Sequence, residues 1–235
     1  MNYLVLNGKN SRYIQGLLIQ ELPPVSKPLM RTQIEEIDGR DGDIITDLGF
    51  QSYDRPCKIA LTRNYDIDDV IDYFNFEGEA IFSNEPYLKY KAKVIQKIDF
   101  ERLIRFRTAT VNFHCQPFKH STIETSLTFD ELTENDSSVD VINTGNYKSR
   151  PKLTIYGAGA ITLGVGSQTI FSIALGTEGN ITIDTETLEA YKGTTLKNRI
   201  VSGNYDSFFL EKGLNEIFWT GNVTKIVIEN YSRWL

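Results

Sequence analysis

Apolar residues in the first half of this chain fall into short segments that alternate with polar residues and end at turn-forming residues. A period of two is typical of half-buried β-strands, because successive side chains point to opposite faces of a sheet. The pattern therefore predicts a mainly β fold. The expected strands are residues 3–6, 17–22, 30–37, 57–63, 87–95 and 103–115.

One segment has a helical period instead. Over residues 66–74 four apolar residues recur at the spacing of a single helix face: Ile67, Val70, Ile71 and Phe74. Acidic residues occupy the first turn, where the helix dipole favours negative charge. We predict one short helix here, ended by Gly78.

The two segments 87–95 and 103–115 predict a β-hairpin with a basic outer face. Alternation places Tyr90 and its apolar neighbours on one side and the lysines on the other. A solvent-exposed face is the simplest interpretation. The alternative is a subunit interface in which basic residues meet a neighbour's carboxylates near residues 66–72. The candidates for that interface are Lys89, Lys91, Lys93, Arg105 and Arg107.

The composition changes after Phe118, where residues 119–138 become polar and acidic and are typical of a connector. We therefore expect two domains, 1–135 and 136–235. Short strands separated by glycine-containing turns fill the second, which predicts a β-sandwich or jelly roll. These strands are 139–142, 151–156, 161–165, 169–174, 181–184, 208–210, 216–219 and 225–228.

Two Asp-Gly steps lie between the alternating segment 30–37 and the apolar pair Ile44-Ile45. Glycine adopts positive φ without strain, and the aspartate side chain can bond its own backbone, so each step favours a turn. A hairpin is therefore predicted, with a turn made of Asp38, Gly39, Arg40, Asp41 and Gly42. The Arg40 side chain is either solvent-exposed or paired with a carboxylate of a neighbouring subunit.

Overall charge and cysteine use exclude some classes of protein. A formal charge of −6 and a pI near 5.1 do not favour a nucleic-acid binder, whose surface is usually basic. Cys57 and Cys115 lie in apolar β-like segments, so we expect two buried thiols and no disulfide. We recognise no export signal at the N-terminus, and no apolar run approaches the roughly eighteen residues of a membrane span, so membrane insertion is not expected.

Catalytic and metal-binding patterns are weak. His114 and Cys115 are adjacent on a strand, so their side chains point to opposite faces and do not form a nucleophile pair. The cysteines and histidines lack metal-site spacing, and neither a phosphate-binding glycine loop nor a nucleophile elbow is present. We expect no catalytic, cofactor or metal site, and no enzyme.

A set of short motifs, in order along nearly the whole chain, resembles the distal tail protein (Dit) family of long-tailed, non-contractile phages and prophages. In the first half the motifs are Asn7-Gly8, Gly16-Leu17-Leu18, Pro23-Pro24, the double Asp-Gly turn, and the segment from Val111 to Phe118. In the second half they are Asn143-Thr144-Gly145, Arg150-Pro151, Ile183-Asp184, Gly213-Leu214-Asn215 and Arg233-Trp234-Leu235.

The resemblance implies a barrel- or sandwich-like first domain, with one short helix and a β-hairpin, followed by a galectin-like β-sandwich. It implies a structural virion protein made in the host cytoplasm, a hexameric hub ring, single or stacked in pairs, at the distal end of the tail. Such a ring would bind the tail-tube protein on one side and a tail-associated lysin or tail fibre protein on the other. A receptor-binding protein is a further expected partner, and DNA would only pass through the bore.

A carbohydrate-binding adhesion module is the alternative function. It depends on the predicted sandwich and on its large aromatic side chains, which either pack in the core or form a platform for sugars. These residues are Tyr191, Tyr205, Trp219 and Trp234.

Overall fold

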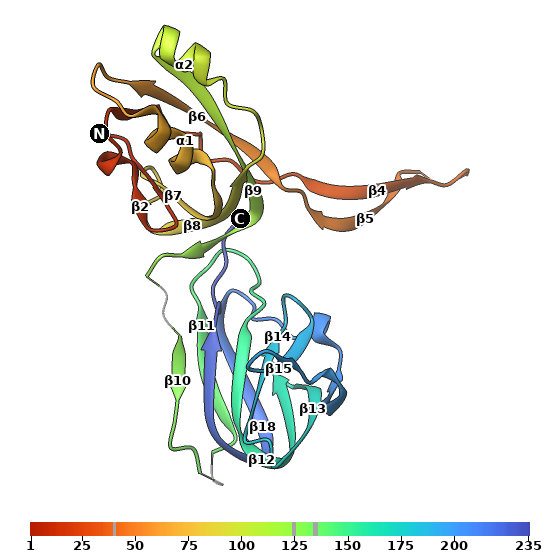
Figure 1. Ribbon diagram of the computed structural model, residues 1–235. Coiled ribbons are helices and arrows are strands. Elements are labelled where there is room, and N and C mark those ends of the chain that lie inside the picture. Colours follow the sequence, from red (N-terminus) through yellow and green to blue (C-terminus); the bar gives the residue numbers. More distant parts are fainter. Residues whose placement is uncertain (40, 124–125, 134–135) are drawn as a thin grey trace. The chain divides into compact units, whose positions relative to one another are not determined.

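The computed structural model describes residues 1–39, 41–123, 126–133 and 136–235, and within them the chain forms two compact units. The first unit is Met1–Thr122 and the second is Ile123–Trp234. Both are built almost entirely from antiparallel strands, as predicted (Figure 1).

The first unit contains a seven-stranded sheet that curls into a half-barrel, and a separate two-stranded hairpin. The order in the large sheet is β2-β1-β7-β8-β9-β6-β3, and β4 and β5 pair with each other. The strands are β1 (Leu4–Leu6), β2 (Lys9–Asn10), β3 (Leu17–Glu21), β4 (Met30–Glu36), β5 (Asp43–Phe50), β6 (Tyr53–Leu61), β7 (Glu77–Phe82), β8 (Leu88–Val94) and β9 (Thr108–Ser121).

The core of the first unit is centred on Phe113 of β9. Its ring lies 5.5 Å from that of Phe82, 6.2 Å from that of Phe76 and 6.4 Å from that of Phe74, measured between centroids. Edge-to-face and tilted contacts of this kind add to the stabilisation that comes from burying the rings. Leu4 of β1 joins the same fully buried cluster, so the core links the strands to the helix that contains Phe74.

Helix α1 (Ile67–Phe74) confirms the predicted helix. Asp66 caps it, because its side chain accepts hydrogen bonds from the backbone N–H groups of Asp68 (3.0 Å) and Asp69 (3.4 Å). The predicted end was wrong. The helix stops at Phe74, and Gly78 lies in β7 with φ +144°, where a side chain would meet Asn7.

A second helix, α2 (Phe100–Phe106), occupies sequence that was predicted to begin a strand at residue 103. The Asp99 side chain accepts a hydrogen bond from the Arg102 N–H (2.9 Å), and Leu103 is fully buried. Arg107 ends the helix in the left-handed conformation, with φ +61°. The first residues of the predicted strand are therefore helical, and β9 starts at Thr108 and continues past the predicted end to Ser121.

The second unit is a nine-stranded β structure that confirms the predicted sandwich class. Its strands are β10 (Leu127–Phe129), β11 (Ser138–Asn143), β12 (Lys152–Val165), β13 (Gln168–Gly176), β14 (Asn180–Asp184), β15 (Glu189–Lys192), β16 (Thr195–Leu196), β17 (Val201–Gly203) and β18 (Gly213–Glu229). Short 3-10 helices cover Asn198–Ile200 and Tyr205–Ser207.

Two long strands hold the second unit together. Predicted segments 151–156 and 161–165 are one strand, β12, and segments 216–219 and 225–228 are one strand, β18. The two pair with each other along their length, with register shifts around residues 156–162. Bulges bend a strand without ending its pairing, so glycines that suggested turns mark bends instead. Segment 208–210 makes only an isolated bridge, through Leu210.

The acidic segment interpreted as a connector contributes a strand to the second unit. Strand β10 pairs with β18, with Thr128 opposite Val227. Residues 124, 125, 134 and 135 of this segment lie outside the described residues. In the described part of the chain, neither helix is long and apolar enough to cross a membrane.

Candidate functional site

The β4–β5 hairpin, called the arm below and comprising residues 30–50, extends away from the sheet of its own unit (Figure 1). Its two strands pair antiparallel, with Ile34 opposite Ile45 and Glu36 opposite Asp43. Nearly every residue of both strands is exposed. A two-stranded hairpin is only marginally stable alone, so this arm depends on its attachment or on a partner.

The predicted turn lies at the tip of the arm. Gly39 and Gly42 both have φ +81°, the left-handed region that the two Asp-Gly steps predicted. A Cβ added at either glycine would meet nothing within 4 Å, so backbone conformation alone favours glycine there. Asp38 and Asp41 are exposed beside them, whereas Arg40 lies outside the described residues.

The arm combines exposed apolar side chains with negative charge. The exposed fractions are 58% for Ile34, 46% for Ile37, 61% for Ile45 and 50% for Leu48. Exposed aliphatic residues gathered on one element are typical of an interaction surface. Six carboxylates accompany them, against Arg31 and Arg40 as the basic residues: Glu35, Glu36, Asp38, Asp41, Asp43 and Asp47.

A buried arginine fixes the base of the arm. Arg55 is 1% exposed and lies in β6, directly after the arm, and its Nη2 donates to the carbonyl oxygens of Pro23 (3.5 Å) and Pro24 (3.3 Å), which precede the arm. Asn84 Nδ2 also donates to the Pro23 carbonyl, at 2.9 Å. Both chain segments that connect the arm to the sheet are thus tied to the same place.

Glu85 supplies the counter-ion at this anchor. Its carboxylate pairs with Arg55 Nη2 at 3.1 Å and with Lys119 Nζ at 3.0 Å, and it accepts a hydrogen bond from the Tyr90 hydroxyl. The Arg55 guanidinium also lies over the rings of Tyr90 (4.3 Å) and Phe82 (4.7 Å). We call Arg55, Glu85, Tyr90 and Lys119 the anchor cluster.

Electrostatics within the anchor cluster keep Glu85 ionised. Burial alone raises the pKa of its carboxyl, but hydrogen bonds from Tyr90 and Lys119 and the charges of Lys119 and Arg55 outweigh that effect, so the pKa is lowered. Burial and the hydrogen bond to Glu85 raise the pKa of Tyr90, which stays a neutral donor. Two buried cations therefore share one buried carboxylate, and removing Glu85 would leave them unbalanced.

The structure separates the five basic residues that were predicted to belong to one hairpin. Lys89 and Lys93 are on β8, where they pair with Glu79 (2.7 Å) and Glu77 (2.6 Å) of the adjacent strand β7. Lys91 lies between them on the same exposed face and has a partner too. Sequence reasoning missed these pairs because β7, with Gly78 as its second residue, was not recognised as a strand.

The two arginines lie elsewhere. Arg105 is on helix α2, with its guanidinium 5.4 Å from the centroid of the Phe106 ring. Arg107 caps that helix, with its guanidinium 4.8 Å from the centroid of the Tyr65 ring. Neither belongs to the β8–β9 pair, so the basic hairpin predicted from alternation includes the three lysines only.

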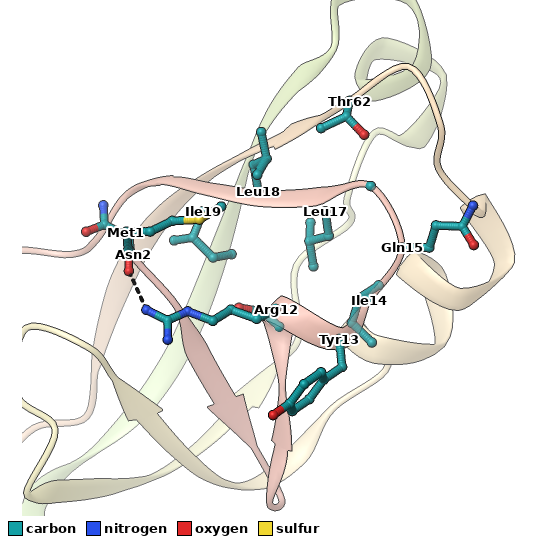
Figure 2. Close-up of a pocket in the computed structure, with 12 residues that line it drawn as sticks. Met1, Asn2, Arg12, Tyr13, Ile14, Gln15, Leu17, Leu18, Ile19 and Thr62 are labelled. Carbon is teal, nitrogen blue, oxygen red and sulfur yellow. Dashed lines mark hydrogen bonds between the residues drawn. The ribbon is translucent and has the colours of Figure 1, made fainter.

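Figure 2 shows a pocket of about 390 Å³ beside the edge strand β3, next to the 3-10 helix Ser11–Tyr13. Arg12 supplies the one charged side chain among its lining residues. Its Nη2 donates to the Met1 carbonyl (2.9 Å), and the guanidinium lies 4.3 Å from the centroid of the Tyr3 ring. Arg12 is thus held in place by contacts within its own unit.

The remaining candidate residues serve structure. Cys57 and Cys115 are free and buried, as predicted, and burial raises the pKa of each thiol to about 12. His114 Nδ1 pairs with Asp54 Oδ1 at 2.8 Å on the opposite face from the Cys115 thiol. Across the described ranges no group of three His, Cys, Asp or Glu side chains is arranged to hold a metal ion.

The aromatic side chains of the second unit mostly fill its core. Trp219 is 2% exposed, and Tyr205 packs edge-on against Phe171 at 5.0 Å between centroids. Tyr191 and Trp234 are half-buried. Large rings in these positions supply buried apolar area, and Trp219 presents no exposed face to a sugar, whereas Tyr205 is half-buried like Tyr191 and Trp234.

The curled sheet with its arm, followed by the second β unit, is the fold of a phage tail hub protein. The crystal structure of the SPP1 Dit protein, described as a paradigm of the hub adsorption apparatus in phages that infect Gram-positive bacteria, has it. The two are 17% identical, with a TM-score of 0.67 over 100% of both chains. The Dit-like fold predicted from the motifs is therefore confirmed.

A weaker likeness links this chain to the phage P2 baseplate in its activated conformation with Ca. The identity is 10% and the TM-score 0.48, over 100% of this chain and 98% of the other. A score that low does not establish a common fold. No protein-family model matches the sequence. No curated protein matches it either.

Proposed function

We propose that this chain is a structural, non-catalytic protein of a long-tailed phage or prophage, located at the distal end of the tail. The observation that supports this most strongly is the likeness to SPP1 Dit over the full length of both chains, because it covers both units. The ordered motifs of the sequence point to the same family independently of the coordinates.

In this proposal the first unit assembles into a hexameric ring, and the second unit takes a peripheral place. A closed ring needs a heterologous interface, in which one surface of a subunit fits a different surface of the next. The arm supplies one such surface, since it exposes Ile34 and Ile45 as a cross-strand pair. Arg55 ties the segment before the arm to β6, the strand that follows it.

The partners in this proposal follow from the position of a hub. The ring would bind the tail-tube protein on one face and a tail-associated lysin or tail fibre protein on the other, with a receptor-binding protein as a further candidate. DNA would pass through the bore only. The lysines Lys89, Lys91 and Lys93 remain candidates for a subunit contact, although Lys89 and Lys93 already pair with β7.

Electron microscopy of the purified full chain tests the ring directly. We expect negative-stain images of rings and, by light scattering, a mass six or twelve times that of the 26.8 kDa chain. A monomer at every concentration up to about 100 μM would contradict self-assembly, which needs at least weak affinity in that range. Binding of the monomer to a glycan array would instead favour the adhesion alternative.

A further inference from the structure

Helix α2 combines exposed apolar side chains with positive charge, whereas the arm combines them with negative charge. Phe106 is 61% exposed and Ile104 is 40% exposed, although both lie on a helix that packs through the fully buried Leu103. Arg102 precedes Phe106 by four positions, so the two are neighbours on the helix surface, and the Arg105 guanidinium lies 5.4 Å from the centroid of the Phe106 ring. We call these three residues and the cap residue Arg107 the α2 surface.

The arginines of the α2 surface are available for a partner. In the part of the chain that the structure describes, Arg102, Arg105 and Arg107 are exposed and form no ion pair. Asp99, the nearest carboxylate before the helix, is engaged as its N-cap. Arginine is well suited to such a contact because its planar fork binds carboxylates in two places at once.

We propose that the arm of one subunit docks on the α2 surface of the next copy of this chain. The inference rests on the proposed self-assembly and names the two surfaces that meet. One face of the arm carries the exposed side chains of Ile34 and Ile45. Three carboxylates share that face and pair with no arginine or lysine in the described part of the chain: Glu36, Asp43 and Asp47. Docking then buries apolar side chains of both surfaces and brings the carboxylates of the arm close to the arginines of the α2 surface.

The positions of the two surfaces fit a head-to-tail contact. The arm precedes Tyr53, the first residue of β6, whereas Leu61, the last residue of β6, donates its N–H to the carbonyl of Arg107 at 3.0 Å. A nine-residue strand spans roughly 30 Å. The arm also points away from α2 in its own unit (Figure 1). Each subunit therefore carries the two complementary surfaces at opposite ends of one strand, as a heterologous ring requires.

The lysines of β8 are a poorer match for the arm. Lys89 and Lys93 lie 2.7 and 2.6 Å from carboxylates of β7, so a new contact would compete with existing pairs. The α2 arginines give up no ion pair when a carboxylate approaches. If the Coulomb attraction is equal, the arm should therefore bind the α2 surface more tightly than it binds the β8 lysines.

Charge reversal in the full chain tests the docking. The double variant Arg102→Glu with Arg105→Glu should raise the dissociation constant of the oligomer about tenfold or more, as measured by light scattering across a dilution series. Adding Glu36→Arg and Asp47→Arg, which lie on the arm face that carries Ile34 and Ile45, should restore much of the affinity. The matched control is Arg199→Glu with Lys212→Glu, which reverses two exposed charges of the second unit and should leave the mass unchanged.

Cross-linking locates the contact. In the double variant Ile45→Cys with Phe106→Cys, mild oxidation should join neighbouring subunits, whereas the native Cys57 and Cys115 are buried and should not react. An oligomer that survives the α2 reversal and gives no cross-link would overturn the docking and leave the proposed function standing. A wild-type chain that stays monomeric would overturn both. Far-UV circular dichroism confirms that the exposed substitutions leave the fold intact.

Discussion

Replacing Glu85 with Gln tests whether the anchor cluster is held by charge balance. The substitution keeps the size of the side chain but removes its charge, and it turns one acceptor oxygen into an N–H donor. Arg55 (1% exposed) and Lys119 (4% exposed) would then remain as two buried cations without a counter-ion. The carboxylate side chain they share is itself only 9% exposed, so water cannot replace it easily.

Glu85→Gln should lower the free energy of unfolding by a large amount for a substitution that keeps the shape of the side chain. Removing one partner of a buried ion pair costs about 3–5 kcal/mol, because the other charge stays buried and unpaired. Such a loss lowers the denaturation midpoint of a unit this size by on the order of 1 M guanidinium chloride. By comparison, Lys119→Met leaves Arg55 and Glu85 as a balanced pair and should cost only about 1–3 kcal/mol.

The two tryptophans make the assay specific for one unit. Trp219 and Trp234 both lie in the second unit, so tryptophan fluorescence follows that unit, while far-UV circular dichroism follows both. In Glu85→Gln we expect the dichroism signal to show an earlier transition at lower denaturant. The fluorescence transition should stay in place.

An exposed ion pair provides the matched control. Glu79→Gln removes the carboxylate that pairs with Lys89 at 2.7 Å, but the Glu79 side chain is 57% exposed, so the expected change is below about 1 kcal/mol. The reasoning is refuted if Glu85→Gln is no more destabilising than Glu79→Gln. It is also refuted if Lys119→Met is the more damaging of the two changes in the anchor cluster, because charge balance would then not be the dominant effect.

Three further predictions follow from the first unit. Folding lowers the pKa of the Glu85 carboxyl. Its contribution to the free energy of unfolding is therefore complete above its unfolded pKa of about 4.3 and is lost as the pH falls through the folded pKa. The difference in free energy of unfolding between wild type and Glu85→Gln should narrow below about pH 4, as measured by denaturation curves. Thiol reagents at about pH 8 should label neither Cys57 nor Cys115 in the folded chain and both in denaturant, since burial raises each pKa to about 12; rapid labelling of the native chain would contradict this. Gly42→Ala should weaken the arm by about 1 kcal/mol through strain at φ +81°, seen as faster amide exchange in β4 and β5 only, whereas Gly42→Asn should be milder because Asn tolerates that conformation.

Local patterns predicted the parts of the fold whose signals are themselves local. Helix α1 was predicted because its cap, its acidic first turn and its buried Val70 and Phe74 all fall within nine residues. The arm was predicted because Asp-Gly steps specify positive φ, which Gly39 and Gly42 adopt. In both cases the sequence carries the whole physical cause in one short segment.

The errors come from segments whose structure depends on distant contacts. Alternating apolar and charged residues before β9 fit a strand, but the Asp99 cap and the burial of Leu103 against the sheet make the segment helical. Strand β7 begins Glu-Gly-Glu, a poor strand sequence, and forms because β1 and β8 pair with it on both sides. Tertiary pairing overrides local preference in each case.

The anchor cluster shows why a site of this kind is hidden in the sequence. Arg55, Glu85 and Lys119 are thirty or more residues apart and belong to β6, the β7–β8 loop and β9, so no spacing rule connects them. The one local signal was the pair Pro23-Pro24, whose carbonyls Arg55 binds. Only pairing of the strands places these charges at the base of the arm.

The buried charges of the anchor cluster are best explained by the arm that they support. A buried cluster with two cations and one carboxylate is a costly way to stabilise a core, and apolar packing would serve as well or better. Hydrogen bonds to Pro23 and Pro24, however, tie the segment before the arm to β6, and hydrogen bonds are more directional than apolar contacts. An arm held in one direction loses less entropy when it docks. Arg55→Lys keeps the charge but removes the guanidinium that binds Pro23 and Pro24. This variant should therefore have a lower oligomer affinity even in conditions where the first unit remains folded, and an unchanged affinity would show that the arm's direction is set elsewhere.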